Sequence, residues 1–324
     1  MHDYTVIRAG EPGVRYPLNA ERRADRLVDA DQAKAFLGLD TPTFEENAVR
    51  RDQLPRVGNS FAYHDLVAMA LDRDLPRSVP TLALRMMMRF ADQSREALVA
   101  TVRWEFRMPL GESEIEGGGE LVLRDPTVAH MELHGSFLRS SSGDGWLMPR
   151  KSGTVIEGTM DTEGKQSGLI NPAASALFDE ILGIFRSDLV RFQWVSDFGR
   201  AEWERTWESG RADCVVLART ANRMLLKRGL TTRFQWGRIL GMLDARHVWT
   251  EILDDDGAWK RFDPLLQLNS ERLWGQGDIR GTFFKGGAAN AMPGWPGESS
   301  MLVRRDGGAE HDLFPAFTAR RVDA

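Results

Sequence analysis

The sequence predicts an α+β protein, in which helices and antiparallel strands occupy separate stretches of the chain. Three observations support this fold class. Apolar residues recur at helical spacing before residue 98 and again after residue 170, and strand-like runs divided by turn residues fill the part between. In addition, residues 214–263 combine the pattern of one helix with the pattern of one hairpin.

The N-terminal helices are predicted from apolar spacing and from end signals. The clearest windows are residues 29–38 and residues 80–98, and the second is dense in leucine, methionine and phenylalanine. Residues 97–159 contain several runs rich in β-branched, leucine and aromatic residues, and glycine-rich or Asp-Pro turns divide them. We therefore expect several antiparallel strands there.

A boundary between two parts is predicted within residues 158–174, which are mainly small and polar. A strong amphipathic helix pattern follows at residues 177–192. Eight of the ten tryptophans lie in the second part, and all three tyrosines lie in the first. We expect an N-terminal region, 1–170, of unknown role and a separate C-terminal domain, 171–324.

Composition and charge narrow the functional classes. Hydrophobic residues make up 42% and charged residues 27% of the 324 positions, which is close to the globular average and excludes general disorder and fibrous repeats. The formal net charge of −5 argues against electrostatic binding of nucleic acid or anionic membranes. The sequence shows neither a secretion signal nor a long apolar run, so a cytoplasmic location and neutral or polar small partners are expected.

Cys214 is the single cysteine of the chain. An intramolecular disulfide, a four-cysteine zinc site and an iron–sulfur cluster are therefore excluded. Cys214 opens a run of apolar residues at helical spacing that ends at Gly229, and Asp213 is placed to cap that helix. On the first turn, unpaired backbone N–H groups and the helix dipole favour a thiolate. A lone cysteine is more often an inert buried residue, so a reactive one also needs a nearby base.

His247 is the candidate base, because it begins a strand-like run that meets an Asp-rich turn and a returning run. If a three-residue loop at 254–256 pairs Leu253 with Gly257, His247 lies opposite Asp263. A carboxylate would then sit beside the imidazole. Cysteine, histidine and aspartate in this order follow the logic of a catalytic triad, in which the third group orients the base.

These residues resemble the transglutaminase-like superfamily of papain-like cysteine enzymes. Its pattern is a cysteine at a helix start, then His-x-Trp-x-Glu, then a strand that ends in Asp-Pro, and residues 207–267 match it in that order. The resemblance implies a nucleophile helix on an antiparallel sheet within the C-terminal domain. It also implies Cys214 as nucleophile, His247 as general base and acid, Asp263 as the orienting carboxylate, and an acyl-thioester intermediate. No cofactor and no metal are expected.

Two branches of the superfamily are poorer matches. The His-Val-Trp-Thr-Glu string at 247–251 is similar to that of cytosolic peptide N-glycanases, but those enzymes carry zinc-binding cysteine pairs, which this chain lacks. Arylamine N-acetyltransferases share the triad. Their nucleophile usually lies early in the chain, however, and the Trp-x-Glu after His247 is unlike them.

Further site residues are expected around the triad. The backbone N–H of Cys214 and a side chain before it would hold the oxyanion, as the resemblance implies, and Trp207, Trp203 and Gln193 are candidates for that side chain or for the cleft. Each of these three also fits core packing. Trp249 and Glu251 alternate onto the His247 face of the strand, where the hairpin places Trp249 opposite Arg261 and where Glu251 is expected to support the sheet.

A metal site is the alternative interpretation of His130, Glu132 and His134, which alternate on a predicted strand and share one face. We favour a solvated strand face, because a stable site usually needs a fourth ligand and second-shell partners.

The expected function is cysteine-dependent acyl transfer, most directly the hydrolysis or transamidation of an amide bond in a peptide or small metabolite. Water or an amine would accept the acyl group. A second hypothesis is an amide-forming acyltransferase of small-molecule biosynthesis that takes a carrier-protein thioester as donor. A third is a non-catalytic binding module with the same fold. No nucleic-acid or membrane partner is expected, and the oligomeric state is left open.

Overall fold

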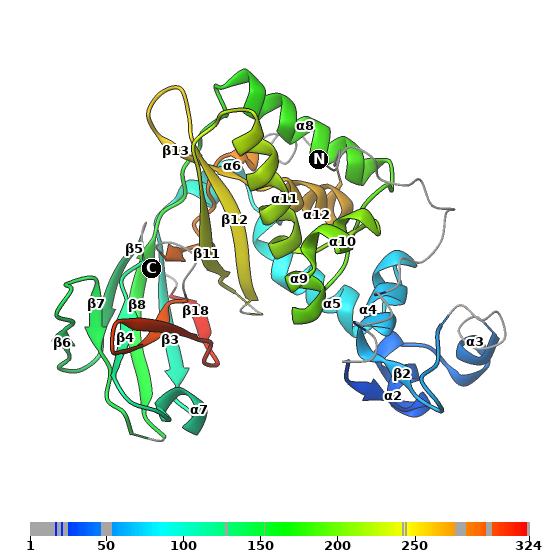
Figure 1. The fold of residues 1–324 in the computed structure, drawn as a ribbon, viewed down its shortest axis with the longest axis horizontal. Helices are drawn as coiled ribbons and strands as arrows, with labels where there is room; N and C mark the ends of the chain where they lie inside the picture. Colours follow the sequence, from blue (N-terminus) through cyan, green and yellow to red (C-terminus); the bar gives the residue numbers. More distant parts are fainter. Residues whose placement is uncertain are drawn as a thin grey trace.

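The computed structural model describes residues 17, 21, 25–46, 54–126, 129–151, 153–241, 243, 245–275, 283–295 and 300–322. Helices and antiparallel sheets occupy separate parts of the molecule, which confirms the α+β class. Figure 1 shows small N-terminal helices at one end, two strand-rich sheets at the other, and a third sheet with helices between them. No helix among the described residues is long and apolar enough to cross a membrane.

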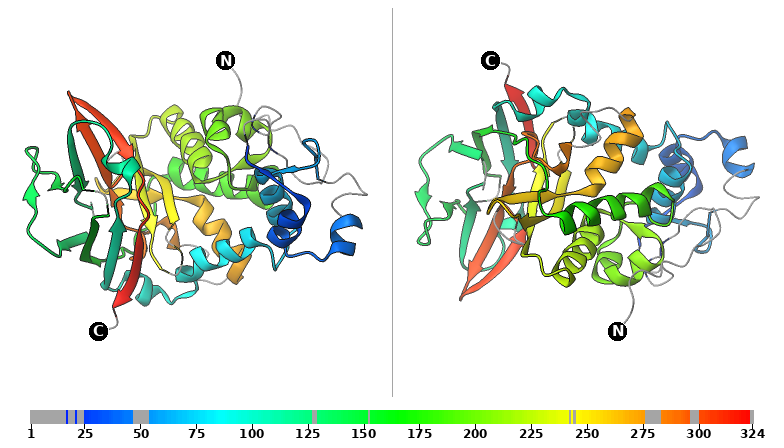
Figure 2. Two further views of the ribbon diagram at one scale, coloured as in Figure 1. Left: turned by 90° about the horizontal axis from the view of Figure 1, so that it is seen from below. Right: turned by 90° about the horizontal axis from the view of Figure 1, so that it is seen from above.

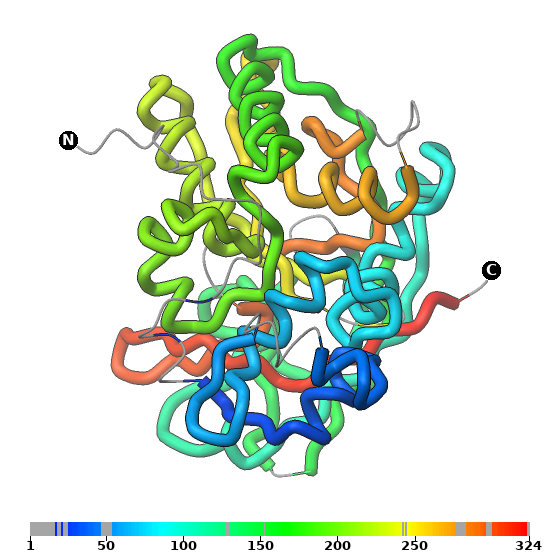
Figure 3. Tube along the Cα trace, turned by 90° about the vertical axis from the view of Figure 1, so that its right-hand side faces the viewer, coloured from blue at the N-terminus to red at the C-terminus, as the bar shows by residue number. Residues whose placement is uncertain are grey.

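The N-terminal unit is a small group of helices and short strands, and Figure 3 views the molecule from its end. The predicted helix at 29–38 is confirmed, because Asp29 accepts the N–H of Gln32 at 2.8 Å and Gly38 ends the helix with a φ of 65°. The elements of this unit are β1 Leu27–Val28, α2 Ala30–Leu37, α3 Thr41–Phe44, β2 Phe61–Ala62 and α4 Tyr63–Asp72.

The single helix predicted at 80–98 is wrong. The chain instead forms α5 Val79–Met87, the 3-10 helix η2 Met88–Asp92 and α6 Arg95–Val99. Gln93 adopts an extended conformation, and Ser94 then caps a new helix by accepting the N–H of Ala97 at 3.3 Å. Ser94 is a helix-start signal inside the apolar pattern, and the local cap outweighs the periodicity.

The antiparallel strands predicted within 97–159 are confirmed, and the C-terminal strands complete both of their sheets. One sheet has the order β18-β3-β8-β5 and the other the order β17-β16-β4-β7-β6. A division at residue 170 therefore cuts through two sheets, as Figure 2 shows, where the red C-terminal strands lie among green ones. The elements are β3 Val102–Pro109, α7 Glu112–Ile115, β4 Glu120–Arg124, β5 Ala129–Leu133, β6 Leu138–Arg139, β7 Gly145–Leu147, β8 Val155–Thr162, β16 Leu302–Asp306, β17 Ala309–Leu313 and β18 Thr318–Val322.

The helix predicted at 177–192 is present but shifted toward the N-terminus, as α8 Pro172–Arg186. Asn171 accepts the N–H groups of Ala173 and Ala174, and Pro172 occupies the first turn, so the helix starts earlier than its apolar pattern indicates. The chain after it forms β9 Arg191–Phe192, α9 Asp197–Ala201, α10 Trp203–Glu208 and β10 Arg211–Ala212, and β9 and β10 pair in parallel.

The central sheet and the helix packed on it carry His247 and Cys214. Helix α11 Cys214–Lys227 packs against its strands, and Thr250 donates its hydroxyl to the carbonyl of Ala218 at 2.9 Å. The sheet has the order β14-β13-β12-β11-β15, and α12 follows its third strand in the chain. Its elements are β11 Thr232–Ile239, β12 Ala245–Leu253, β13 Trp259–Phe262, α12 Pro264–Trp274, β14 Lys285–Gly286 and β15 Gly294–Trp295.

The predicted hairpin is present, but its predicted register is wrong. Leu253 pairs with Trp259 instead of Gly257. The reason is that Asp254 donates its backbone N–H to the carbonyl of Ala258 and so continues the hydrogen-bonding pattern of the two strands by one residue. The three-residue loop therefore begins one residue later than expected and ends at Gly257, whose φ is 74°. The cross-strand partner of each β12 residue is two positions further along β13 than predicted, so every side chain keeps its predicted face of the sheet.

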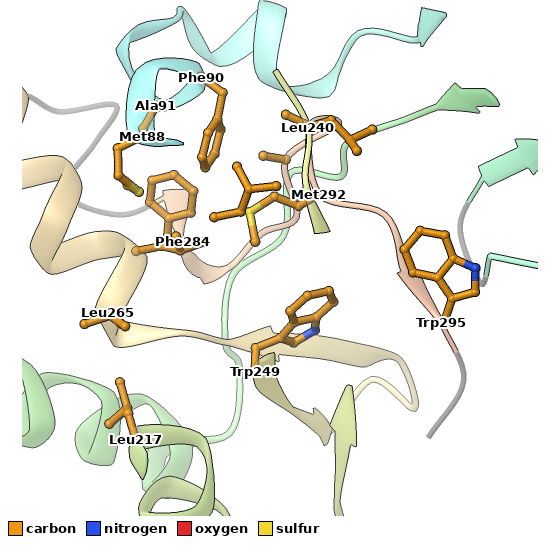
Figure 4. Close-up of a cluster of buried hydrophobic side chains, with 14 of the residues drawn as sticks. Met88, Phe90, Ala91, Leu217, Leu240, Trp249, Leu265, Phe284, Met292 and Trp295 are labelled. Carbon is orange, nitrogen blue, oxygen red and sulfur yellow. The ribbon is translucent and has the colours of Figure 1, made fainter. Parts of the chain in front are cut away.

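A continuous hydrophobic core joins the central sheet to its helices and to the segment after β13. Figure 4 shows Leu217 of α11 below Leu265 of α12, with Phe284 and Met88 further along the same cluster, to which Trp249 of β12 also belongs. Packing of this kind holds helix α11 against strand β12.

Candidate active site

Cys214 is the first residue of α11, as the sequence predicts, and its side chain is half-buried. Asp213 caps the helix, because its Oδ1 accepts the N–H of Val216 at 3.0 Å. The first intrahelical bond runs from the N–H of Leu217 to the carbonyl of Asp213. The earlier N–H groups, that of Cys214 among them, precede this ladder and point out of the helix start, where negative charge is stabilised.

His247 and Asp263 meet in the structure, although they are not directly opposite in the sheet. The last pair of the β12–β13 ladder joins Thr250 to Phe262, and Asp263 follows as the cap of α12. Its Oδ2 lies 2.6 Å from Nε2 of His247, and both side chains are buried. The predicted contact is therefore confirmed in a different register.

The Cys214 thiol lies close enough to His247 to influence its protonation, and both residues line one cavity. Because Asp263 occupies Nε2, Nδ1 is the ring nitrogen available for the sulfur. Burial opposes protonation of the ring, but the charge and hydrogen bond of Asp263 and the contacts with Cys214 outweigh it and raise the pKa of His247 to about 10. The three side chains thus lie in the order thiol, imidazole, carboxylate.

Trp249 packs against the imidazole from the same strand, and Glu251 supports Trp249. The rings of His247 and Trp249 stack with centroids 5.8 Å apart, and the Trp249 indole donates to Glu251 Oε1 at 3.2 Å. Glu251 in turn is paired with Arg233 at 2.6 Å. The guanidinium of Arg261 lies 3.9 Å from the centre of the Trp249 ring, and burial lowers the pKa of this arginine. These contacts fix the ring against which His247 lies.

A cavity of about 640 Å³ opens beside Cys214 and His247. Asp197, Arg200 and Arg219 line it, together with apolar side chains from several elements. A cavity of this size is in the range of small-molecule sites.

None of Trp207, Trp203 and Gln193 lines this cavity, so their predicted place in the cleft is wrong. Trp207 is buried in the core against Phe185, with ring centroids 6.0 Å apart. The other two also have partners elsewhere. Trp203 has the guanidinium of Arg223 over its ring, and Gln193 is fully buried with bonds to Arg211 and Asp72.

Sequence comparison bears on the segment that holds these residues. Residues 161–264 match the transglutaminase-like superfamily. This segment is a transglutaminase-like domain. It includes Cys214, His247 and Asp263, and it supports cysteine-based catalysis in general. No curated protein matches the chain.

One solved structure is similar to a large part of the chain. It is the crystal structure of a proposed cysteine protease from Cytophaga hutchinsonii, with 10% sequence identity and a TM-score of 0.29. The similarity covers 69% of this chain and 89% of that one. A TM-score of this size is too low to indicate a shared fold, so the transglutaminase-like domain rests on its sequence match.

Arg200 is a residue of the transglutaminase-like domain that sequence patterns do not indicate. Its Nε donates to Asp213 Oδ2 at 2.7 Å, and its guanidinium lies close enough to Cys214 to respond to charge on the sulfur. Burial opposes this cation, but Asp213 and Cys214 outweigh it and raise the pKa of Arg200. Arg200 and Cys214 do not belong to one short sequence motif, because α10 and β10 separate them in the chain.

Asn269, which follows the matched segment, is a second residue that sequence patterns do not indicate. It lies on α12, is 2% exposed and lines the cavity. Its Oδ1 is buried without a hydrogen-bond partner in the described structure. Such an atom is costly unless a ligand or water satisfies it, so Asn269 is suited to contact a bound molecule.

A buried ion pair supports the strand that leads to Cys214. Arg211 of β10 and Glu21 are both fully buried, with Nη1 and Oε2 2.9 Å apart. Glu21 also accepts the hydroxyl of Ser196 at 2.6 Å. A residue outside the transglutaminase-like domain thus helps to position the chain three residues before the thiol.

The residues considered for a metal do not form a site. His130 and Glu132 face solvent on β5 with 3.6 Å between their charged atoms, and His134 follows the strand as an exposed residue. Among the residues that the structure describes, no group of three such side chains could hold a metal ion.

Proposed function

We propose that this protein is an enzyme that transfers acyl groups through a thioester on Cys214. The observation that carries the proposal is that Cys214 and His247 line one cavity, while Nε2 of the buried His247 lies 2.6 Å from Asp263 Oδ2. A nucleophile, a base and an orienting carboxylate in this order are the parts that nucleophilic catalysis needs.

In the first step, the sulfur of Cys214 attacks a carbonyl carbon, and a tetrahedral oxyanion forms. The Cys214 backbone N–H, at the helix start, is placed to stabilise that oxygen. Protonated His247 then gives its proton to the leaving amine or thiol as the bond to the carbonyl carbon breaks. The acyl group remains on sulfur.

In the second step, His247 removes a proton from water or from an amine, and this acceptor attacks the thioester. The Cys214 sulfur leaves, and the acid or the new amide departs. Asp263 holds the ring through Nε2. Hydrolysis or transamidation of an amide in a peptide or small metabolite is the reaction we favour.

Amide formation from a carrier-bound thioester is the second candidate, and one observation favours it. A second cavity of about 620 Å³ shares Trp194, Asp197 and Arg200 with the first, and Tyr63 and His64 of the N-terminal unit line it. Two adjoining cavities would suit a donor and an acceptor that meet at one thiol.

The test is the pH dependence of iodoacetamide alkylation, followed by intact mass, for the native protein and for His247→Ala. The single cysteine makes each added mass unambiguous. We expect rapid alkylation of the native protein well below about pH 8 and loss of that reactivity in the variant. His130→Ala is the matched control, because His130 is exposed on β5 and does not line the Cys214 cavity, and its profile should follow the native one. An ordinary thiol profile for the native protein would instead favour a non-catalytic binding module.

A further inference from the structure

The cavity at Cys214 is lined by two chemically different sets of side chains. Cys214 packs against the main core and also against a small cluster of Val215, Ala218 and Val248. The first set is apolar and buried. Its side chains are Leu84, Met88, Phe192, Leu265 and Leu266.

The second set consists of two arginines, Arg219 and Arg246. Arg219 follows Cys214 on α11 and donates Nη1 to the carbonyl of Arg200 at 2.7 Å. The guanidinium of Arg246 lies 4.5 Å from the centre of the Phe314 ring. Of the residues described by the structure, no carboxylate lies within ion-pair distance of either arginine, whereas Arg200 is paired with Asp213.

The exposure of the two sets indicates which part of a donor each one contacts. The acyl group stays on the enzyme until the second step, so it belongs against the buried apolar set, where water is excluded. The leaving group must depart and the acceptor must enter, so both need the more exposed side chains. Arg246 is exposed and Arg219 is half-buried.

We infer that the acyl donor of this protein has an apolar acyl group and a leaving group that bears an anion, which Arg219 and Arg246 bind. The inference rests on the proposed acyl transfer. The carbonyl carbon forms a bond to Cys214 sulfur, its bond to the leaving sulfur or nitrogen breaks, and His247 supplies the proton to the departing group. A carboxylate and a phosphate are both suited to paired guanidinium groups.

The experiment compares thioesters that differ in the charge of the leaving group. S-octanoyl 3-mercaptopropionate carries a carboxylate, its methyl ester is the neutral equivalent, and S-octanoyl 2-mercaptoethyl phosphate carries a phosphate. The readout is kcat/KM for thioester loss, corrected for spontaneous hydrolysis. We expect the native protein to prefer an anionic donor over the methyl ester by about tenfold, and the preferred anion identifies the natural group as carboxylate or phosphate.

The double variant Arg219→Gln/Arg246→Gln should lower this preference to about one while it still turns over the methyl ester. Arg228→Gln is the matched control, because Arg228 follows the same helix but pairs with Glu180 and does not line the cavity. Its preference should equal that of the native protein. Added salt should weaken the preference of the native protein and leave the methyl ester rate unchanged.

Equal rates for the anionic and neutral donors in the native protein overturn the inference alone. An unchanged preference in a double variant whose melting temperature is native also overturns it. If no donor is consumed, the proposed acyl transfer fails and the inference fails with it. The methyl ester rate therefore separates failure of the function from failure of the anion site.

Discussion

Asp263 performs two tasks with its two carboxylate oxygens. Oδ2 lies 2.6 Å from Nε2 of His247, and Oδ1 accepts the N–H of Leu266 at 3.3 Å as the cap of α12. The cap holds the carboxylate in place independently of the imidazole, so the orientation of His247 depends on a helix start as well as on its own strand.

Asp263→Asn should separate these two tasks, because asparagine also caps helices but removes the charge. The pKa of His247 is raised from 6.5 to about 10 in the folded protein. Protonated His247 therefore stabilises the fold fully below pH 6.5, and this contribution is lost as the pH rises toward about 10. We expect the native protein to melt several degrees above the variant below pH 6.5, and the difference to shrink toward pH 10.

Thermal denaturation across this pH range measures the difference. Asp179→Asn is a suitable control, since it removes an exposed carboxylate paired with Lys285 and should give a gap that does not depend on pH between these limits. A gap for Asp263→Asn that grows with pH would contradict the charge assigned to His247.

The contact between His247 and Asp263 could be predicted from sequence, because the types, spacing and order of Cys214, His247 and Asp263 are informative by themselves. Arg200 and Asn269 could not, because a tertiary contact and an unsatisfied atom become visible only after folding. The expected cleft residue Gln193 shows the same limit. Its neighbours Phe192 and Trp194 line the cavity, while its own amide binds Arg211 and Asp72.

At the scale of elements, the hairpin at 245–262 shows why one side chain changes a register. Asp254 resembles a turn residue in an Asp-Asp-Asp-Gly sequence. In the structure its carboxylate accepts the N–H groups of Ile170 and Asn171 at 2.7 and 2.8 Å and pairs with Lys260 at 2.7 Å. These distant partners hold Asp254 in the ladder, and local turn statistics do not contain them.

Asp254→Ala should lower the free energy of unfolding by about 3 kcal/mol, because a buried carboxylate with several donors is removed and the ammonium of Lys260 loses its buried partner. The midpoint of urea denaturation measures the loss. Asp256→Ala is the matched control from the same turn. Asp256 is exposed, and its ion pair is with Lys260. We therefore expect its loss to change the free energy of unfolding little. Equal losses in the two variants would refute the anchoring role of Asp254.

At the scale of the whole molecule, the order of elements could be predicted but their assembly could not. Helical, strand-rich and helix-hairpin parts follow one another as expected. Strand β18 pairs with β3, and strand β16 pairs with β4. Strands from the C-terminal part therefore complete the sheets of the strand-rich part. Strand patterns indicate which face is buried but not which strand is the neighbour, so a boundary at residue 170 was consistent with the sequence.

A chain that ends at residue 299 should lose its cooperative fold. The deletion removes β16 to β18 and with them the buried side chains of Leu302, Val303 and Phe317, each worth about 3 kcal/mol or more in a core. The combined loss is comparable with the whole stability of a typical domain. A chain that ends at residue 322 retains every described strand and is the control. A cooperative melting transition within a few degrees of native for the shorter chain would contradict this expectation.

The pairing of Arg103 with Val322 also has a consequence for synthesis on the ribosome. Strand β3 emerges long before its neighbour β18, because the two strands lie far apart in the sequence. The ladder between them cannot close until the intervening residues have been made, while the exposed edge of β3 can pair with other nascent chains. Contacts this distant in sequence form slowly, so the yield of native protein should depend on translation rate and on chaperones that cover that edge.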